Sequence, residues 1–168
     1  MADISNVKLG VCSVKFNAID LGHTKGGVVI TYEPTYHDVT VDMYGETVVD
    51  KKLLGEKLIA KVPLAESTLA NLQIAIPEGT TSGDKLTIGS TVGDALSDGA
   101  KQLILHPIAN LTANLDDDVV FHKAVVSSQV EIAFTNDGEK IFEVEFTALL
   151  DETKSDGNYL GFIGDSTT

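Results

Sequence analysis

The sequence predicts a mainly β fold, a β-sandwich or barrel of two packed antiparallel sheets with one flanking α-helix and a long hairpin arm. Along most of the 168 residues, apolar and polar side chains alternate with a period of two, whereas helical spacing is scarce. Fifteen glycines divide this pattern into short segments, as in sandwiches and barrels. A chain of this length usually forms one domain, so residues 1–168 are expected to fold as a single unit.

The expected strands are the segments in which the alternation is clearest. They cover residues 11–16, 28–33, 39–43, 56–64, 85–88, 101–106, 119–126, 129–135 and 140–149. One segment departs from this pattern, because Leu69, Leu72 and Ile76 recur at helical spacing. Ser67 is the expected N-cap of this helix and Pro77 ends it. Residues 78–99 are rich in Gly, Ser, Thr and Asp and are expected to be mostly loop.

The last two strands are expected to form a hairpin through a three-residue loop at residues 136–138. This loop pairs Ile132 with Phe142 and Val130 with Val144, which gives one apolar face. A two-residue loop would mix the two faces.

The opposite face of this hairpin would then carry Glu131 across from Glu143, with Glu145 nearby. Directly opposed like charges destabilise a strand pair by up to about 1 kcal/mol. This acidic face has two possible interpretations: a functional acidic surface, or an ordinary solvated face with a lysine close by.

The chain is strongly acidic, with 25 acids against 12 bases and a formal net charge of -13. All the bases are lysines, so arginine, the usual residue for bidentate phosphate contacts, is absent. Tight nucleic-acid binding is therefore not expected, although an acidic surface would let DNA pass without sticking. No apolar run approaches the roughly 20 residues that cross a bilayer, and the N-terminal residues lack the pattern of a signal peptide.

No catalytic, metal or cofactor site is expected. The four histidines are widely separated, and the clusters His37-Asp38 and Asp116-Asp117-Asp118 lack the spacing of metal ligands. The lone Cys12 lies in an alternating strand, where a structural thiol is the expected role. Because glycine-rich and nucleophile motifs are also missing, the chain is not expected to be an enzyme.

The stretch VTVDMYGETVVDKKLLGEKLIAKVPL, residues 39–64, carries an unusual feature. About fourteen residues separate its two alternating ends, more than a hairpin loop needs, and this arm loop at about residues 44–57 holds paired aliphatics. Such pairs either fold back on their own domain or contact another copy. The candidate contact residues are Tyr44, Gly45, Val48, Val49, Leu53, Leu54 and Gly55.

The chain resembles the tail tube (major tail) proteins of tailed bacteriophages with long, non-contractile tails. The resemblance is carried by TYEPTYHDVTVDMYGETVVDKKLLGEKLIAKVPLAE at residues 31–66 and FTALLDETKSDGNYLGFIGD at residues 146–165. It implies a structural virion protein whose hexameric rings stack into a flexible tube. Genomic DNA would leave through its acidic lumen during ejection into the host cell. The arm loop would contact neighbouring subunits.

The resemblance also implies partners and a location. The partners would be further copies of the chain, the tape measure, terminator and distal tail proteins, and double-stranded DNA in passage, without membrane binding. The protein would be made in the host cytoplasm and reside in the virion tail. Glu131, Glu143 and Glu145 are the candidates for a lumen-facing acidic surface. The alternatives are a tube protein of a contractile tail or secretion system, or a β-sandwich binding module, against which the absence of tryptophan argues.

Overall fold

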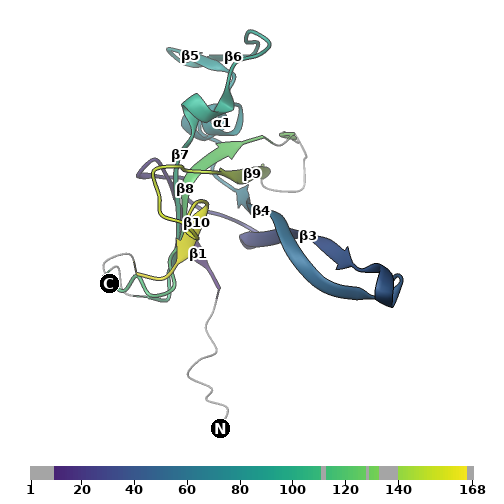
Figure 1. The fold of residues 1–168 in the computed structure, drawn as a ribbon. Coiled ribbons are helices and arrows are strands. Elements are labelled where there is room, and N and C mark those ends of the chain that lie inside the picture. Colours follow the sequence, from purple (N-terminus) through teal and green to yellow (C-terminus); the bar gives the residue numbers. More distant parts are fainter. Residues whose placement is uncertain (1–9, 111–112, 128, 133–139, 166–168) are drawn as a thin grey trace.

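The structure, a computed structural model, describes residues 10–110, 113–127, 129–132 and 140–165 (Figure 1). Its elements are β1 (Cys12–Phe16), β2 (Ile19–Asp20), β3 (Val29–Thr40), η2 (Asp42–Tyr44), β4 (Val48–Leu64), α1 (Leu69–Ala75), β5 (Thr80–Ser82), β6 (Lys85–Thr87), η3 (Leu96–Gly99), β7 (Lys101–Pro107), β8 (Val119–Val126), β9 (Phe142–Leu149) and β10 (Gly161–Ile163).

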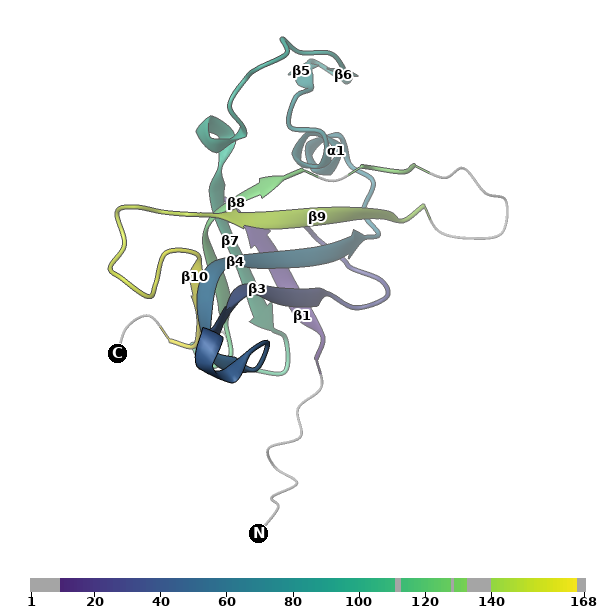
Figure 2. The same cartoon turned by 45° about the vertical axis from the view of Figure 1, so that its right-hand side comes forward.

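The predicted fold class is confirmed, because the described chain is mainly β with one helix and a long hairpin. The large antiparallel sheet has the order β2-β1-β7-β8-β9-β4-β3, and β10 also pairs with β8; β5 and β6 form a separate small sheet. In Figure 2, β9, β4 and β3 run across β1, β7 and β8, as in orthogonal sheet packing. The two packed layers are therefore halves of one sheet, joined where β8 pairs with β9.

Side chains from both layers meet in a single core. Val14 on β1 and Phe121 on β8 are fully buried, as are Val62 on β4 and Phe146 on β9. The rings of Phe16 and Phe146 lie 5.2 Å apart between their centroids. The alternation predicted for residues 140–149 is confirmed, since Phe142, Val144, Phe146 and Ala148 are all buried. This core fixes the position of β4, the strand that continues into the hairpin.

The predicted helix is present but begins one residue later than expected. Thr68, not Ser67, is the N-cap, and its Oγ1 accepts a hydrogen bond from the Asn71 amide at 3.2 Å. The buried Asn71 side chain donates 2.9 Å hydrogen bonds to the backbone oxygens of Leu21 and Glu66. These bonds tie the helix to the segments that follow β2 and β4, because a buried amide must find such partners.

Several strands differ from the predicted ones. Residues 28–33 and 39–43 were expected as two strands, but β3 runs without interruption over Val29–Thr40. The expected arm loop is also largely strand, since β4 begins at Val48. The short strands β2, β5 and β10 were not predicted, because two or three residues are too few to show a period of two.

The predicted pairing of the last hairpin is wrong for the described residues. Residues 129–132 lie outside any strand, while 133–139, including the expected loop, lie outside the described residues. Strand β9 instead pairs with β4, which places Phe142 opposite Leu64 and Val144 opposite Val62. On its other side, Phe146 lies opposite Val126. The described partners of β9 are therefore β4 and β8, both of which have buried faces.

A buried carboxylate holds the segment after β9 against β8. The side chain of Asp151 is 9% exposed and lies 3.0 Å from the Lys123 ammonium. It also accepts hydrogen bonds from Thr153, at 2.8 Å from the hydroxyl and 3.2 Å from the backbone amide. The Thr153 hydroxyl and then Lys123 lower the pKa of Asp151 from 3.8 to about 2.

We expect Asp151→Asn to destabilise the fold near neutral pH and to have less effect as the pH falls toward 2. A carboxyl group whose pKa is lowered on folding stabilises the folded state above its ordinary pKa of 3.8, and loses this contribution as the pH approaches about 2. Urea unfolding of both proteins across this pH range measures the difference. The exposed Asp116→Asn is the control, and an equal loss at every pH would contradict this origin.

Candidate functional site: an exposed apolar arm

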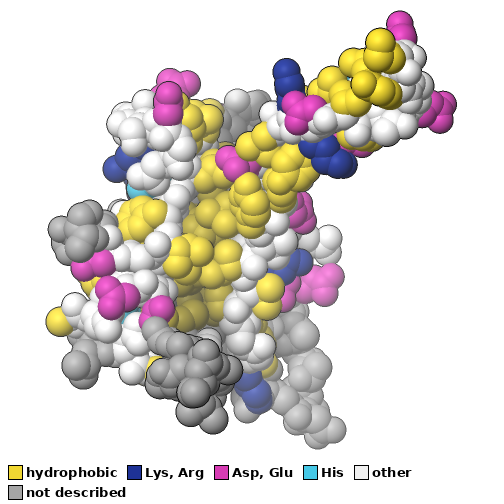
Figure 3. Space-filling model, turned by 60° about the horizontal axis from the view of Figure 1, so that its bottom comes forward, with side chains coloured by type: hydrophobic (Ala, Val, Ile, Leu, Met, Phe, Trp, Pro, Cys, Tyr) yellow, Lys and Arg dark blue, Asp and Glu magenta, His cyan; other side chains and the backbone are white. Residues whose placement is uncertain are grey.

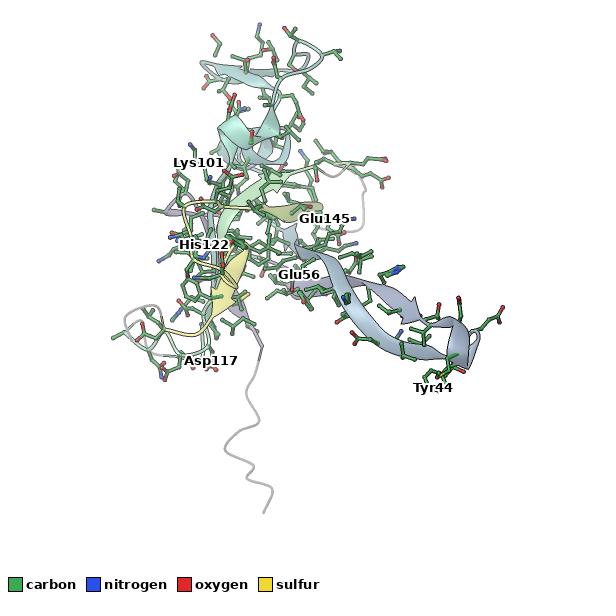
Figure 4. The ribbon with its side chains drawn as sticks, viewed as in Figure 1. Tyr44, Glu56, Lys101, Asp117, His122 and Glu145 are labelled. Carbon is green, nitrogen blue, oxygen red and sulfur yellow. The ribbon has the colours of Figure 1, made fainter. Side chains whose placement is uncertain are left out.

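The most prominent surface feature is a hairpin arm formed by β3 and β4 beyond the body. We define the arm as residues 32–58, with Tyr44 near its tip (Figure 4). Strand β9 covers β4 only between Ile59 and Leu64, so the arm extends past the sheet that supports its base. The tip turns through η2 and Gly45, whose φ of 61° suits glycine. The arm therefore consists of two strands with water on both sides.

Two β-bulges explain the paired aliphatics of the sequence. Thr35 lies opposite Gly55 and Tyr36 opposite Leu53, so Leu54 is an extra residue in β4. A second bulge lies closer to the tip. There, Val39 lies opposite Asp50 and Thr40 opposite Val48, so Val49 is an extra residue in β4. Each bulge sets two residues of one strand against a single residue of its partner. The double aliphatics are thus features of a strand rather than of a loop.

One face of the arm is apolar and exposed. Since Tyr32 lies opposite Leu58 and Ile30 opposite the buried Ala60, this face continues the core-facing side of β4. Figure 3 shows hydrophobic side chains along the arm that continue onto the body. Leu54 is 68% exposed and Tyr32 is 54% exposed. We call this surface, together with Ile30 just below it on β3, the arm face; its residues are Ile30, Tyr32, Tyr36, Val48, Val49, Leu53 and Leu54.

The polar groups of the arm face are paired with one another. The Tyr32 hydroxyl donates a 2.5 Å hydrogen bond to Glu56, and the Lys51 ammonium lies 2.8 Å from Asp38. The hydrogen bond to Glu56, followed by a smaller contribution from burial, raises the pKa of Tyr32 above its ordinary value. Because these groups already have partners, covering the arm face costs less than covering unpaired charges.

The candidate contact residues therefore all lie on the arm, some at its tip and others at its two bulges. Tyr44 and Gly45 form the tip, where Met43 is also 84% exposed. Val48-Val49 and Leu53-Leu54 occupy the two bulges, and Gly55 follows the Leu53-Leu54 bulge on the opposite face from Leu53. Sequence reasoning missed Tyr32, Tyr36 and Ile30 of the arm face; the alternation of residues 30, 32 and 36 was the available signal.

Two hollows on the body are lined mainly by apolar side chains. The upper groove, of about 640 Å³, lies between α1, the end of β1 and residues 90–99. The basal groove, of about 320 Å³, lies where the arm leaves the body, between Tyr32 and Leu58 on one side and residues 159–163 on the other. The basal groove thus extends the arm face onto β10. Neither hollow was predicted, because both depend on contacts between distant segments.

The three candidate lumen acids are not brought together as the predicted hairpin would require. Glu143 and Glu145 share the outer face of β9, opposite the core face. Glu145 lies 3.2 Å from the Lys61 ammonium on β4, so the nearby lysine of the alternative interpretation is present. Glu131 is exposed outside any strand and accepts a 3.2 Å hydrogen bond from Gln129.

The remaining polar candidates have structural partners. His106 and Asp118 form a 2.6 Å contact between β7 and the start of β8, and Asp117 accepts a 2.9 Å hydrogen bond from Asn110. Cys12 is half-buried against the core, and burial raises the pKa of its thiol. Within the described ranges, no three His, Cys, Asp or Glu side chains cluster closely enough to hold a metal ion. No helix in the same ranges is long and apolar enough to span a membrane.

We expect Glu56→Gln to lower the pKa of Tyr32 back toward its ordinary value of 10.0. The amide removes the carboxylate that favours the protonated phenol through its hydrogen bond and charge. Ultraviolet absorbance during an alkaline titration, with Tyr32→Phe to assign the signal, measures this shift. The control is Asp156→Asn, which should act instead on Tyr159, whose pKa is raised by its hydrogen bond to Asp156. An unchanged Tyr32 titration in the Glu56 variant would contradict this bond on the arm face.

No protein-family model matches the chain. A search of curated proteins also finds no match to its sequence. A functional assignment therefore depends on the residues and geometry of the chain itself.

Proposed function

We propose that the chain is a structural subunit that assembles with copies of itself into stacked rings, forming the tail tube of a phage and a conduit for its DNA. The observation that carries this proposal is the arm face, an exposed apolar surface on a projecting hairpin.

The arm face is better suited to contact with protein than with water. Burying apolar surface is favourable by about 25 cal/mol per Å². An isolated two-stranded hairpin is only marginally stable in water, and β9 supports the arm at its base alone. A second subunit laid against Leu53, Leu54 and Tyr36 would therefore stabilise the arm and bury the exposed patch.

The body offers free strand edges for lateral association. Strand β3 pairs only with β4, and β10 pairs only with β8, so each has one open side among the described strands. Exposed edges tend to pair with other chains, and a closed ring removes them. A contact between two different surfaces of identical subunits closes into rings when the rotation allows it, and stacked rings give a tube.

The charge of the chain fits a conduit for DNA better than a tight binder. The formal net charge is -13 and arginine is absent, so the chain as a whole repels phosphates. Glu143 and Glu145 lie on the solvent-facing side of β9, where a lumen surface would need acids. DNA would then slide without fixed contacts. Tape measure, terminator and distal tail proteins are the partners that such a tube requires at its core and ends.

We expect the wild-type protein to form tubes in negative-stain micrographs, and Leu53→Asp/Leu54→Asp to remain a folded monomer. Both leucines are exposed, so the change costs the body little, whereas a buried interface would have to take up two charges. Circular dichroism checks the fold and sedimentation checks the size.

The matched control is Ile108→Asp, which changes a 61% exposed aliphatic that follows β7 and should leave assembly intact. Normal tubes from the double leucine variant would exclude the arm face as an assembly surface. A wild-type protein that stays monomeric in every condition, including with tail assembly partners, would overturn the proposed function itself.

We expect Glu131→Lys/Glu143→Lys to assemble normally but to slow DNA ejection, because two lysines in the lumen would bind phosphates. Both acids are exposed, and Glu145 is left unchanged because it pairs with Lys61. Phage carrying this subunit, tested for ejection at several salt concentrations, provide the measurement. The control is Asp84→Lys on the turn between β5 and β6. Ejection at the wild-type rate would place both acids outside the bore.

A further inference from the structure

The arm is a sheet layer that lacks the second layer of a sandwich. In the body, the core-facing side of β4 packs against the layer that contains β1, β7 and β8, so Ala60 and Val62 are completely buried. Beyond the basal groove the same side of β4 continues as part of the arm face, where Leu58 is half-buried and Leu54 is 68% exposed. Packed sheet layers lie about 10 Å apart with apolar side chains between them. The arm face therefore lacks a second layer with an apolar inner side.

The arm of a second copy fits this description. Outside the arm face, the described strands expose large apolar side chains only at Ile19, Val29 and Ile163, which lie on three different strands. The arm face instead carries its tyrosines and aliphatics together on two adjacent strands. Exposed apolar patches of this kind mark interaction surfaces. Among the described strand faces, a second arm face is therefore the one that could supply the missing layer.

The charges on this side of the arm lie symmetrically about its leucine pair. Lys51 lies two residues from Leu53 toward the tip, and Glu56 lies two residues from Leu54 toward the base. Each is also two positions along β3 from the pair of Tyr36 with Leu53, so both share the face of the leucines. A second arm laid over the first in the antiparallel direction would place Lys51 of each copy over Glu56 of the other. The charge pattern is therefore complementary to itself.

Lys51 and Glu56 can each take a second partner. The Lys51 ammonium has three N–H donors and lies 2.8 Å from Asp38, which leaves donors for another acid. The Tyr32 hydroxyl binds one oxygen of Glu56, and the other oxygen has no partner among the described residues. Because the existing contacts already hold both side chains in position, less conformational entropy is lost when they pair across an interface.

The shape of the body favours the antiparallel direction. Residues 159–163 lie across the basal groove from Tyr32 and Leu58, so the body covers the arm face at its base. Two arms that point the same way would bring this segment of both copies into the same space. In antiparallel arms, Val48 lies over Leu58 of the other copy, since each is four paired positions, about 13 Å, from the leucine pair. The tip of each arm then reaches the basal groove of the other copy.

We propose that two free copies of the chain pair through their arm faces. The arms stack antiparallel, with Leu53 and Leu54 of both copies at the centre and Lys51 of each facing Glu56 of the other. This pairing goes beyond the proposed function, because it concerns subunits before assembly and does not require a tube. The same residues meet in both directions, so the contact closes at two copies and does not propagate. A subunit that joins a ring must exchange this contact for those of its ring neighbours.

A mixing experiment with two single variants tests this arrangement. Lys51→Glu alone and Glu56→Lys alone should each weaken pairing by about tenfold or more, because the symmetry places like charges opposite one another twice. Mixed together, the two variants should form a dimer with one copy of each, since opposite charges then face one another at both positions. The double variant Lys51→Glu/Glu56→Lys should pair with itself again. Analytical ultracentrifugation of differently labelled chains, below the concentration at which tubes form, measures the size and the ratio.

The matched controls make the same charge changes on the opposite face of the arm. Lys52 lies opposite His37 and Glu33 lies opposite Lys57, so both point away from the leucine pair. Lys52→Glu and Glu33→Lys should each pair as the wild type does, and their mixture should show no preference for mixed dimers. Because these variants carry the same net charges as the test variants, they separate a specific contact from general attraction between oppositely changed chains. Circular dichroism checks that every variant is folded.

The outcomes separate this pairing from the proposed function. Wild-type protein that forms dimers but never tubes, even with tail assembly partners, overturns the proposed function alone. Wild-type protein that forms tubes but is purely monomeric below the assembly concentration overturns the pairing alone. A mixture of Lys51→Glu and Glu56→Lys that stays monomeric, or control variants that form mixed dimers equally well, also overturns the pairing. Protein that is monomeric in every condition overturns both.

Discussion

Strand β4 runs from the arm to the centre of the core, and its register determines which side chains enter each place. Val62 and Ala60 on its inner side are completely buried, while Leu54, farther along the strand, is 68% exposed. A shift of one residue would turn the buried side chains outward along the whole strand. The core therefore determines which way the side chains of the arm point. Pairing with β9 sets the register of β4, and this register sets the orientation of the exposed aliphatics. Fold and candidate assembly surface depend on the same hydrogen bonds.

The sequence predicted the parts of the molecule in which local pattern and burial agree. Alternation along Phe142, Val144, Phe146 and Ala148 identified a strand whose inner face is buried. The helix was found from three apolar residues, although its cap was misplaced by one position. The paired aliphatics Val48-Val49 and Leu53-Leu54 are predicted to lie on an arm, and the structure places them on the projecting hairpin, although within strand β4 rather than in a loop.

The failures share a physical cause, which is that strand partners are chosen by packing between distant segments. Strand β9 pairs with β4 and β8, whereas residues 129–132 lie outside any strand, and local sequence patterns do not predict that choice. The sequence pattern predicts a loop where the structure has bulges, because an extra residue in a strand has the same local appearance as the end of a strand. Grooves are even harder to predict from the sequence, since side chains from β1, α1, β8 and the segment before β7 line the upper groove.

The continuity of β4 also has a mechanical consequence. Force applied to the arm would pass along the covalent backbone of one strand into the middle of the sheet. There, β4 is held by six residue pairs with β9 on one side and by β3 on the other. Pulling along the strand loads these hydrogen bonds together in shear instead of opening them one at a time. An arm built in this way can bear tension while the body keeps its shape, a property that a flexible loop of equal length would lack.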